Sequence, residues 1–345
     1  MDNQNSKITI IGAGPVGLMC AIYAINNNFR PIIISLDEEN QKTAGVAAGG
    51  MLAPAYECFE EADDDLTNFA LCSRKEWDNI AKALGIDIAP YALALGNDDD
   101  ELARLEKIKA RAKSFDLIFE YIKPYDFLDC KHALSLTTDG LLNPIIAMNR
   151  MRKYCIENGA IFINDEIINI EKNKIFGQKQ DYKSELTIIA NGFNAKKFME
   201  KVSATNKLIA VRGQVIEIDC KPNFDGSMRH NSTYLMARGD KIMVGATSQM
   251  NDEDWQIRET DHEFLFKNAC QLMPQLTDKK VTNSFAGLRP LIKGEAPIIG
   301  ESEIDNVFVA IGAYRNGWAY APYMGKILIE NIALGTNIPM YLSGK

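Results

Sequence analysis

Histidine is scarce in this chain of 345 residues, and the histidines that occur are isolated. His132, His230 and His262 are the only ones, and they lie far apart in the sequence. The seven cysteines are also scattered, and no two of them form a Cys-x-x-Cys pair. Metal sites and nucleophilic triads need such residues in clusters. The sequence therefore favours neither a metal centre nor a histidine-dependent hydrolase, and its odd number of cysteines is typical of reduced thiols in a cytosolic enzyme.

The chain also lacks long apolar runs and an excess of positive charge. No run approaches the ~18 apolar residues of a membrane-spanning helix, and the apolar residues 8–11 are too few for the core of a secretory signal. The formal net charge is -8 and the pI is about 5.2, which argues against nucleic acid as a partner. We expect a cytoplasmic protein with no membrane span and no nucleic-acid partner. The sequence does not determine the oligomeric state, and a homo-oligomer is one of the open alternatives.

Near its beginning, the sequence contains a glycine motif between two predicted apolar strands. Residues 8–11 form the first strand, and the motif Gly12-x-Gly14-x-x-Gly17 opens the helix that leads to the second. This context defines the dinucleotide-binding fingerprint. Gly12 allows a tight turn, Gly14 lets the backbone approach a pyrophosphate, and Gly17 lets helix and strand pack closely. Pro15 fits the first helical turn, where its missing N–H has no intrahelical partner anyway. We therefore expect a bound dinucleotide with its phosphates at the helix start.

The acidic residue that this fingerprint places about 20 residues further on is displaced. Such a residue binds the ribose hydroxyls from the end of the second strand. Ser35 lies nearest to that position, and Asp37 follows two residues later. Asp37 would reach the ribose if the strand runs long, and Ser35 would make a weaker contact, so both stay candidates.

Two further segments place small residues where a large ligand needs room. Residues 43–57 are small, apolar and rich in glycine, without helical or strand periodicity. They predict a buried loop whose backbone N–H groups need partners, which a cofactor would supply. The apolar strand at 186–190 runs into Gly192. Since ligands lie beyond the carboxyl ends of the strands in a doubly wound sheet, Gly192 is expected near the same nucleotide.

The pattern of the chain changes from α/β to antiparallel at residue 208. Alternation and turns then predict strands at 211–218, 233–237 and 241–246, and with them a second domain. Helices are expected at 63–84, 100–122, 144–155, 261–272 and 317–334. The charges of the second helix are interpreted as a solvated polar face; they are Glu101, Arg104, Lys107 and Lys109.

Several short segments, in this order and spacing, resemble the D-amino acid oxidase family of FAD enzymes, and within it the glycine oxidase group of thiamine biosynthesis. They are residues 12–17, 47–54 with Glu57, 211–214, 234–236, 244–247, 287–290 and 314–317. The resemblance covers nearly the whole chain. It implies an α/β fold with a Rossmann-type FAD-binding domain and an inserted antiparallel-sheet α+β substrate domain. The implied FAD-binding domain is discontinuous (1–84, 138–204 and 282–345), and the substrate domain comprises 85–137 and 205–281.

The resemblance also implies functional residues and noncovalently bound FAD. Arg289 matches the arginine that binds the substrate carboxylate through two parallel hydrogen bonds. Tyr234 matches a tyrosine facing the substrate, and Arg315 a second arginine beside flavin and substrate. The alternative roles are a structural salt bridge for Arg289, a core position for Tyr234 and a local hydrogen bond at a helix start for Arg315. The implied cofactor-binding residues are Gly12, Gly14, Pro15, Val16, Gly17, Ser35, Asp37, Ala47, Ala48, Gly49, Gly50, Met51, Leu52, Ile167, Ala190, Asn191, Gly192, Gly287, Arg289, Gly312, Tyr314, Arg315, Asn316 and Gly317.

The expected reaction is the oxidation of a small amine or amino acid such as glycine. Arg289 and Tyr234 fix the carboxylate and Arg315 assists, so that a hydride passes from Cα to the flavin. The imine then hydrolyses, and dioxygen, giving peroxide, or another electron acceptor reoxidises the flavin. Four alternatives stay open: a flavin-dependent dehydrogenase, an oxidoreductase of the same family that modifies a tRNA base, a nicotinamide-dependent dehydrogenase and a non-catalytic flavoprotein.

Overall fold

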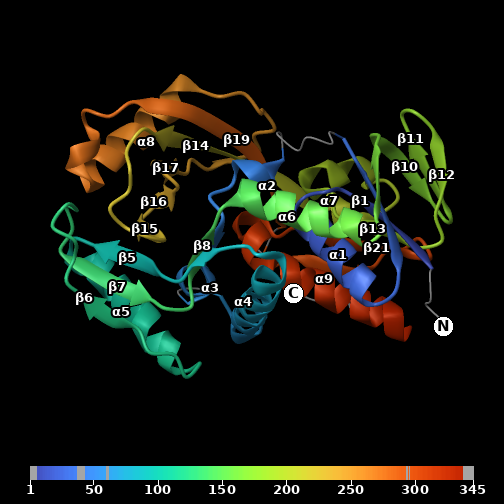
Figure 1. The fold of residues 1–345 in the computed structure, drawn as a ribbon, viewed down its shortest axis with the longest axis horizontal. Coiled ribbons are helices and arrows are strands. Elements are labelled where there is room, and N and C mark those ends of the chain that lie inside the picture. The colour runs from blue at the N-terminus through green and yellow to red at the C-terminus, as the bar shows by residue number, and fades with distance from the viewer. Residues whose placement is uncertain (1–5, 37–42, 60–61, 293, 295, 337–345) are drawn as a thin grey trace.

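A parallel sheet forms the centre of the computed structural model, which describes residues 6–36, 43–59, 62–292, 294 and 296–336 (Figure 1). This six-stranded sheet has the order β20-β21-β13-β1-β2-β9. Neighbours pair in parallel except β20, which is antiparallel to β21. The strands are β1 (Lys7–Ile11), β2 (Arg30–Ser35), β9 (Ile161–Asn164), β13 (Thr187–Ile189), β20 (Ile298–Glu301) and β21 (Val307–Ile311).

The order of these strands reverses between β1 and β13. The chain passes from β1 to β2 and β9 on one side, then returns to β13 and β21 on the other. Ligands of doubly wound sheets bind at this switch point, beyond the carboxyl ends of the strands. Gly12 follows β1 directly, and a Cβ added to it would lie 2.7 Å from the Cα of Asn191, which comes shortly after β13. The predicted α/β fold with its nucleotide-binding topology is confirmed.

Helices cover one face of the parallel sheet and a small antiparallel sheet covers the other. The helices are α1 (Pro15–Asn26), α4 (Asp64–Leu84), α6 (Pro144–Glu157) and α9 (Gly317–Leu334), with α1 in contact with both α6 and α9. On the opposite face lie β10 (Ile167–Glu171), β11 (Lys174–Gly177), β12 (Asp181–Lys183), η1 (Gly192–Phe198) and α7 (Ser203–Asn206). Ile10 packs in the helical core and Ile11 in the core of the other face, because successive strand residues point to opposite sides.

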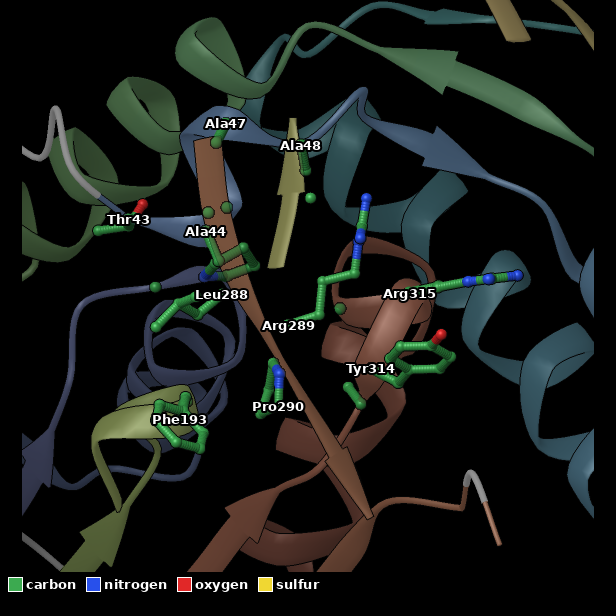
Figure 2. Close-up of a pocket in the computed structure, with 18 of the residues that line it drawn as sticks. Thr43, Ala44, Ala47, Ala48, Phe193, Leu288, Arg289, Pro290, Tyr314 and Arg315 are labelled. Atoms are coloured by element: carbon green, nitrogen blue, oxygen red, sulfur yellow. The ribbon is translucent and has the colours of Figure 1, made fainter. Parts of the chain in front are cut away.

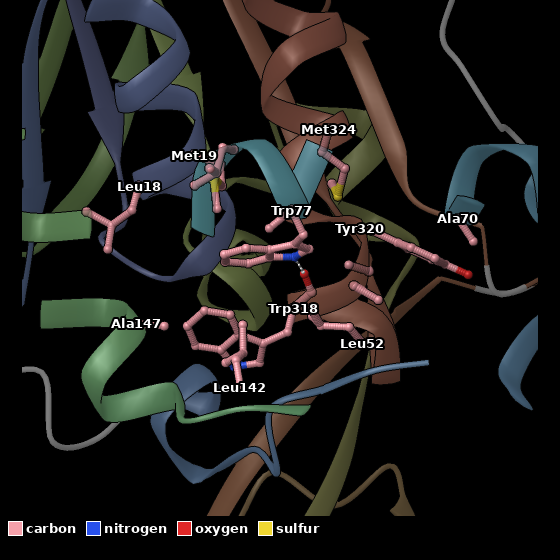
Figure 3. Packing of buried hydrophobic residues seen from close by; sticks show 14 of the residues in the cluster. Leu18, Met19, Leu52, Ala70, Trp77, Leu142, Ala147, Trp318, Tyr320 and Met324 are labelled. Atoms are coloured by element: carbon pink, nitrogen blue, oxygen red, sulfur yellow. Dashed lines mark hydrogen bonds between the residues drawn. The ribbon is translucent and has the colours of Figure 1, made fainter. Parts of the chain in front are cut away.

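Two tryptophans join α4 to the start of α9 (Figure 3). The indole Nε1 of the buried Trp77 donates to the carbonyl oxygen of Trp318 at 2.6 Å. The Nε1 of Trp318 in turn donates to the carbonyl oxygen of Gly45 at 2.9 Å, within the short helix α2 (Ala44–Ala47). Both buried indoles thus have the partner that their N–H groups need. The first bond ties the start of α9 to α4, and the second holds it against the small-residue segment 43–57.

The second large element is a nine-stranded, mostly antiparallel sheet with the order β18-β14-β17-β16-β15-β5-β7-β6, in which β19 also pairs with β14. The helix α8 (Glu259–Leu272) and η2 (Pro274–Leu276) pack on one of its faces, and α5 (Asp99–Lys113) lies beside β5 (Figure 1). The strands are β5 (Ala92–Gly96), β6 (Glu120–Ile122), β7 (His132–Leu136), β14 (Leu208–Ile218), β15 (Ser227–His230), β16 (Thr233–Arg238), β17 (Lys241–Gly245), β18 (Gln249–Met250) and β19 (Val281–Ile292).

The division into two domains stays a prediction, and strand pairing bears on where its last boundary would fall. Strands from 85–137 and from 205–281 share the large sheet. β19 lies almost wholly in the segment 282–345 that was assigned to the FAD-binding domain, yet it pairs with β14 from Leu208 to Ile218. By its hydrogen bonds β19 therefore belongs to the large sheet, and a boundary based on pairing would follow residue 292.

Two local expectations are wrong. The helix expected at 100–122 ends at Lys113; Asp116 adopts a left-handed φ of 57°, and β6 then pairs with β7. A short apolar stretch fits a helix or a strand equally well, and pairing with β7 decides it here. The segment 43–57, expected as a loop, contains α2, β3 (Met51–Leu52) and most of α3 (Pro54–Cys58). β3 joins β8 (Gly140–Leu142) and β4 (Ile88–Ala89) in a second small sheet.

Candidate active site

A cavity of about 1460 Å³ runs from the switch point of the parallel sheet to the inner strands of the large sheet. Such a continuous space suits an extended ligand. Most of the residues predicted to bind the cofactor line it: Gly12, Gly14, Pro15, Val16, Ser35, Ala47, Ala48, Gly49, Gly50, Met51, Ile167, Ala190, Asn191, Gly192, Gly287, Arg289, Gly312, Tyr314, Arg315, Asn316 and Gly317. Tyr234 lines the same cavity.

Three of the predicted cofactor residues are not among those that line the cavity. Leu52 is a buried member of the helical core and packs near Trp77 (Figure 3), so its side chain faces away from the cavity, and its assignment to the cofactor stays a prediction. Gly17 is buried behind the turn, where an added Cβ would lie 2.0 Å from the carbonyl oxygen of Gly12. Asp37 lies outside the described residues. Of the two ribose candidates the structure therefore describes only Ser35, whose hydroxyl donates to the carbonyl oxygen of Leu36 at 3.1 Å.

The cradle between β1 and α1 has the properties that a dinucleotide requires. A Cβ added to Gly14 would meet no protein atom within 4 Å, so the space above this backbone is open. Gly14 is also the N-cap of α1, and no side chain caps the first N–H groups of the helix. Uncapped N–H groups and the helix dipole attract phosphate. The buried Oδ1 of Asn191 has no hydrogen-bond partner within the described chain and can accept one from a ligand. These features fit a dinucleotide cofactor.

Arg289 and Arg315 mark the opposite end of the cavity. Figure 2 shows Arg289 projecting from β19, and Arg315 beside Tyr314 at the start of α9. Tyr314 has a left-handed φ of 46°, a conformation that costs a non-glycine residue about 1–2 kcal/mol and recurs at functional sites. A Cβ added to Gly213 of β14 would lie 2.2 Å from Nη1 of Arg289, so only glycine leaves room for this guanidinium.

Arg289 bonds the backbone of a neighbouring segment and acts electrostatically on Tyr234. The Nη1 of Arg289 donates to the carbonyl oxygen of Thr247 at 3.1 Å, and its positive charge favours the ionised form of the Tyr234 hydroxyl. Burial raises the pKa of Tyr234, against the opposing charges of Arg289 and Arg229, so the phenol keeps its proton near neutral pH. A protonated hydroxyl beside a guanidinium is a pair of donors suited to a carboxylate.

A buried ion pair that the sequence did not predict lies at the same end. Arg229, from β15, binds Glu57, from α3, with 2.6 Å between Nη2 and Oε1. Burial alone would raise the pKa of the Glu57 carboxyl, but Arg229, Arg315 and then Arg289 together lower it. Glu57 is therefore ionised and faces three guanidinium groups. Its segment was noted only for its resemblance, and nothing in the sequence indicated its partner.

The polar face of α5 is not simply solvated: the interpretation holds for the exposed Lys107 but is wrong for Glu101 and Arg104. Arg104 lines the cavity, and its Nη1 donates to the hydroxyl of Tyr56 at 2.9 Å. Glu101 lies 2.9 Å from Nε2 of His230 and also accepts a hydrogen bond from Asn231. α5 thus contributes a wall of the arginine end of the cavity, which we define as Glu57, Arg104, Arg229, Tyr234, Arg289 and Arg315.

Asp139 fixes the helix that carries Tyr56 and Glu57. This fully buried carboxyl group accepts hydrogen bonds from the backbone N–H groups of Ala55 (2.8 Å) and Tyr56 (3.2 Å). These are N–H groups of the first turn of α3, which have no partner within the helix. Burial raises the pKa of Asp139 to about 7, although the backbone donors oppose the shift. Asp139 is therefore a positioning residue for the wall of the cavity.

The raised pKa of Asp139 predicts a pH dependence of stability. Between pH 4 and pH 7 the folded state binds this proton more tightly than the unfolded state, so the free energy of unfolding falls as the pH rises. We expect the wild type to lose roughly 2 kcal/mol more than Asp139→Asn between pH 5 and pH 8, because one pKa unit corresponds to about 1.4 kcal/mol. Urea unfolding of both proteins at the two pH values measures the difference. Parallel pH profiles would show that Asp139 titrates normally.

An extended dinucleotide cradle that opens into an arginine-lined pocket defines the class of dinucleotide-dependent oxidoreductases. Residues 7–331 of the chain match the family described as FAD dependent oxidoreductase. The chain belongs to this family, and the predictions of FAD as cofactor and of an oxidoreductase are confirmed. Among the described residues, no helix combines the length and apolarity needed to cross a bilayer.

Proteins named glycine oxidase and a bifunctional protein ThiO/ThiG are similar to this chain over nearly its whole length. It is 26% identical to a glycine oxidase of Bacillus subtilis (strain 168), covering 95% of this chain and 93% of that protein. It is 24% identical to the bifunctional protein ThiO/ThiG of Synechocystis, covering 95% of this chain but only 51% of that protein. The crystal structure of glycine oxidase from Geobacillus kaustophilus has a TM-score of 0.87 at 21% identity, with 98% of each chain covered, which shows the same fold.

Proposed function

We propose that the protein oxidises a small amine that carries a carboxylate, glycine or a related α-amino acid, at the arginine end of its cavity. One observation supports this above all: Arg289, whose charge acts on Tyr234, lines together with it the same cavity that begins at the dinucleotide cradle. A planar guanidinium binds a carboxylate through two parallel hydrogen bonds and so fixes its orientation. The similarity to glycine oxidases points to the same class of substrate.

In this proposal FAD, when bound, supplies the acceptor for the hydride that leaves Cα. The residues of the chain supply position. Arg289 and Tyr234 hold the carboxylate, Arg315 adds positive charge beside it, and the Cα–H bond is thereby directed along the cavity. Holding two reactants in a productive geometry contributes ~7–11 kcal/mol to lowering a barrier. The neutral amine needs no protein base for this step, and the imine product hydrolyses in water. Dioxygen, giving peroxide, or another acceptor then takes the electrons.

The test is an amine screen under anaerobic conditions. Glycine, sarcosine and D-alanine are mixed in turn with the FAD-loaded enzyme, and loss of the visible flavin absorption is recorded. We expect at least one of these amines to bleach the absorption, and oxygen consumption with peroxide formation then separates an oxidase from a dehydrogenase that needs a dye. If none of the three bleaches the flavin, the proposed oxidation of glycine-like amino acids is wrong.

A further inference from the structure

One arginine next to the cavity binds backbone carbonyl groups instead of a carboxylate. Arg238 ends β16 and is not among the described residues that line the cavity. Its Nη2 donates to the carbonyl oxygens of Ala48 (3.3 Å) and Gly49 (3.2 Å). No carboxylate of the described chain lies within ion-pair distance of it, and Glu217 acts on it only at longer range. Burial lowers the pKa of Arg238 to about 10, so the guanidinium keeps its charge at neutral pH.

These two bonds set the direction of two backbone N–H groups. In a planar trans peptide the C=O and N–H bonds point to opposite sides. Because Arg238 binds the carbonyl oxygens of Ala48 and Gly49, the N–H groups of the residues that follow, Gly49 and Gly50, point away from it. Neither N–H group has a hydrogen-bond partner within the described chain, and both glycines line the cavity. Two unused donors therefore face the cavity from the side opposite Arg238.

Close packing keeps these two donors in place. A Cβ added to Gly49 would lie 2.3 Å from Sδ of Met236 in β16, and one added to Gly50 would lie 2.2 Å from the carbonyl oxygen of Leu142, the last residue of β8. Gly50 also has a left-handed φ of 84°. The same added Cβ of Gly49 would lie 3.6 Å from the ring of Tyr234. The donors are thus preorganised at the arginine end of the cavity and need no rearrangement to act.

We propose that Arg238 is a positioning residue that directs the N–H groups of Gly49 and Gly50 toward the flavin ring, strengthens them as donors and so raises the reduction potential of FAD. A hydrogen bond to the carbonyl group polarises the peptide, which makes its N–H a better donor. Reduction adds electrons to the ring, and donors and positive charge beside it stabilise the negative charge that develops. The inference goes beyond the proposed function, because it requires only that the ring lies at the arginine end, whatever amine is oxidised there.

The reduction potential of bound FAD tests this inference without any substrate. The FAD-loaded wild type and its variants are equilibrated with a redox dye of known potential during slow anaerobic reduction. We expect Arg238→Met to lower the equilibrium constant for two-electron reduction at least tenfold, a shift of about 30 mV. Arg238→Lys keeps the positive charge and should recover at least half of this shift. The control is Lys241→Met, which removes a charge from the strand paired with β16; Lys241 binds Asp219, so this variant should keep the wild-type potential.

Sulfite provides a second readout, which needs no electron donor. Its electron pair forms a bond to the oxidised flavin ring, which then carries the negative charge and loses its visible absorption. Groups that stabilise negative charge on the ring tighten this adduct. We expect Arg238→Met to weaken sulfite binding at least tenfold, Arg238→Lys to lie in between and Lys241→Met to be unchanged. The unfolding temperature and the FAD affinity are measured beside it, because a merely structural role would lower these two and leave the potential and the sulfite affinity unchanged.

Arg238→Gln guards against loss of the cofactor. It removes the charge but keeps an amide donor for the carbonyl groups, and it takes the place of Arg238→Met in both measurements if that variant does not retain FAD. Wild-type potential and sulfite affinity in the neutral variant would overturn the inference, as would an equal shift in Lys241→Met. Loss of FAD from both neutral variants would mean that Arg238 maintains the binding site itself, which also overturns it.

The amine screen is independent of this result. A lowered potential in Arg238→Met, with no amine oxidised by the wild type, leaves the role of Arg238 standing and overturns the proposed reaction. Oxidation of glycine-like amines with an unchanged potential in Arg238→Met leaves the reaction standing and overturns the role of Arg238.

Discussion

Arg289→Ala is expected to lower kcat/KM for the amino-acid substrate by roughly 10²- to 10⁴-fold, mainly through KM. The guanidinium offers two charge-assisted hydrogen bonds, each contributing about 1.5–3 kcal/mol, and 1.4 kcal/mol corresponds to a factor of ten. Arg289→Lys keeps the positive charge but loses the planar fork. Its kcat/KM should therefore fall less than that of Arg289→Ala, and it should orient the substrate less well than the wild type does. Steady-state kinetics of the wild type and both variants, at equal FAD content, measure the effect.

An amine without a carboxylate provides the matched control for this prediction. Methylamine lacks only the carboxylate of glycine, so Arg289→Ala should change its oxidation or binding far less. Arg289 also donates to the carbonyl oxygen of Thr247, and the unfolding temperature of the variant shows whether loss of that bond disturbs the fold. Equal losses for glycine and methylamine would mean that Arg289 supports the structure of the site and does not bind the carboxylate.

The glycines are the part of this site that the sequence predicts best. Gly12 has a φ of +109°, and Gly17 packs so closely on the turn that an added Cβ would lie 2.0 Å from a backbone oxygen. Each position accepts essentially only glycine, so the sequence itself indicates the tight turn or the close packing that glycine allows there. Their spacing also fixes a strand, a turn and a helix. The nucleotide end of the cavity was therefore predictable from local pattern alone.

The arginine end could be predicted only in part, because its contacts join residues far apart in the chain. Arg289 and Tyr234 stood out by resemblance to a family. Asp139 caps α3 across a separation of 84 residues, and the bond from Tyr56 to Asn231 spans 175. Arg104 looked like an ordinary solvated charge because helical periodicity reports which face it occupies and not what covers that face. Contacts between residues so far apart in the sequence become apparent only in the folded structure, where the sheets bring these residues together.

Gly17→Val is expected to abolish FAD binding and to destabilise the apoprotein by about 1–3 kcal/mol or more, the cost of overpacking a tight interior. The new side chain meets the Gly12 carbonyl oxygen, which is backbone and cannot rotate away. Either α1 moves off the strand or the turn shifts toward Asn191, and both movements deform the phosphate cradle. FAD retained on purification and the thermal unfolding of the apoprotein are the two measurements. A variant that retains FAD at wild-type stability would contradict the close packing of helix and turn.

Gly14→Ala distinguishes this packing effect from a direct effect on the cofactor. Gly14 has a φ of -73°, and a Cβ there meets nothing within 4 Å, so the apoprotein should tolerate alanine. The entropy removed from the unfolded chain and the lower preference of alanine for the N-cap oppose each other, so the free energy of unfolding should change by less than about 1 kcal/mol. The methyl group nevertheless occupies the space above the backbone that a pyrophosphate would approach. We expect FAD affinity to fall at least tenfold, visible as a smaller rise of the unfolding temperature when FAD is added. Because Gly17 acts through the fold and Gly14 through the ligand, only the second variant should weaken binding without weakening the protein. Normal FAD affinity in Gly14→Ala would place the phosphates elsewhere in the cavity.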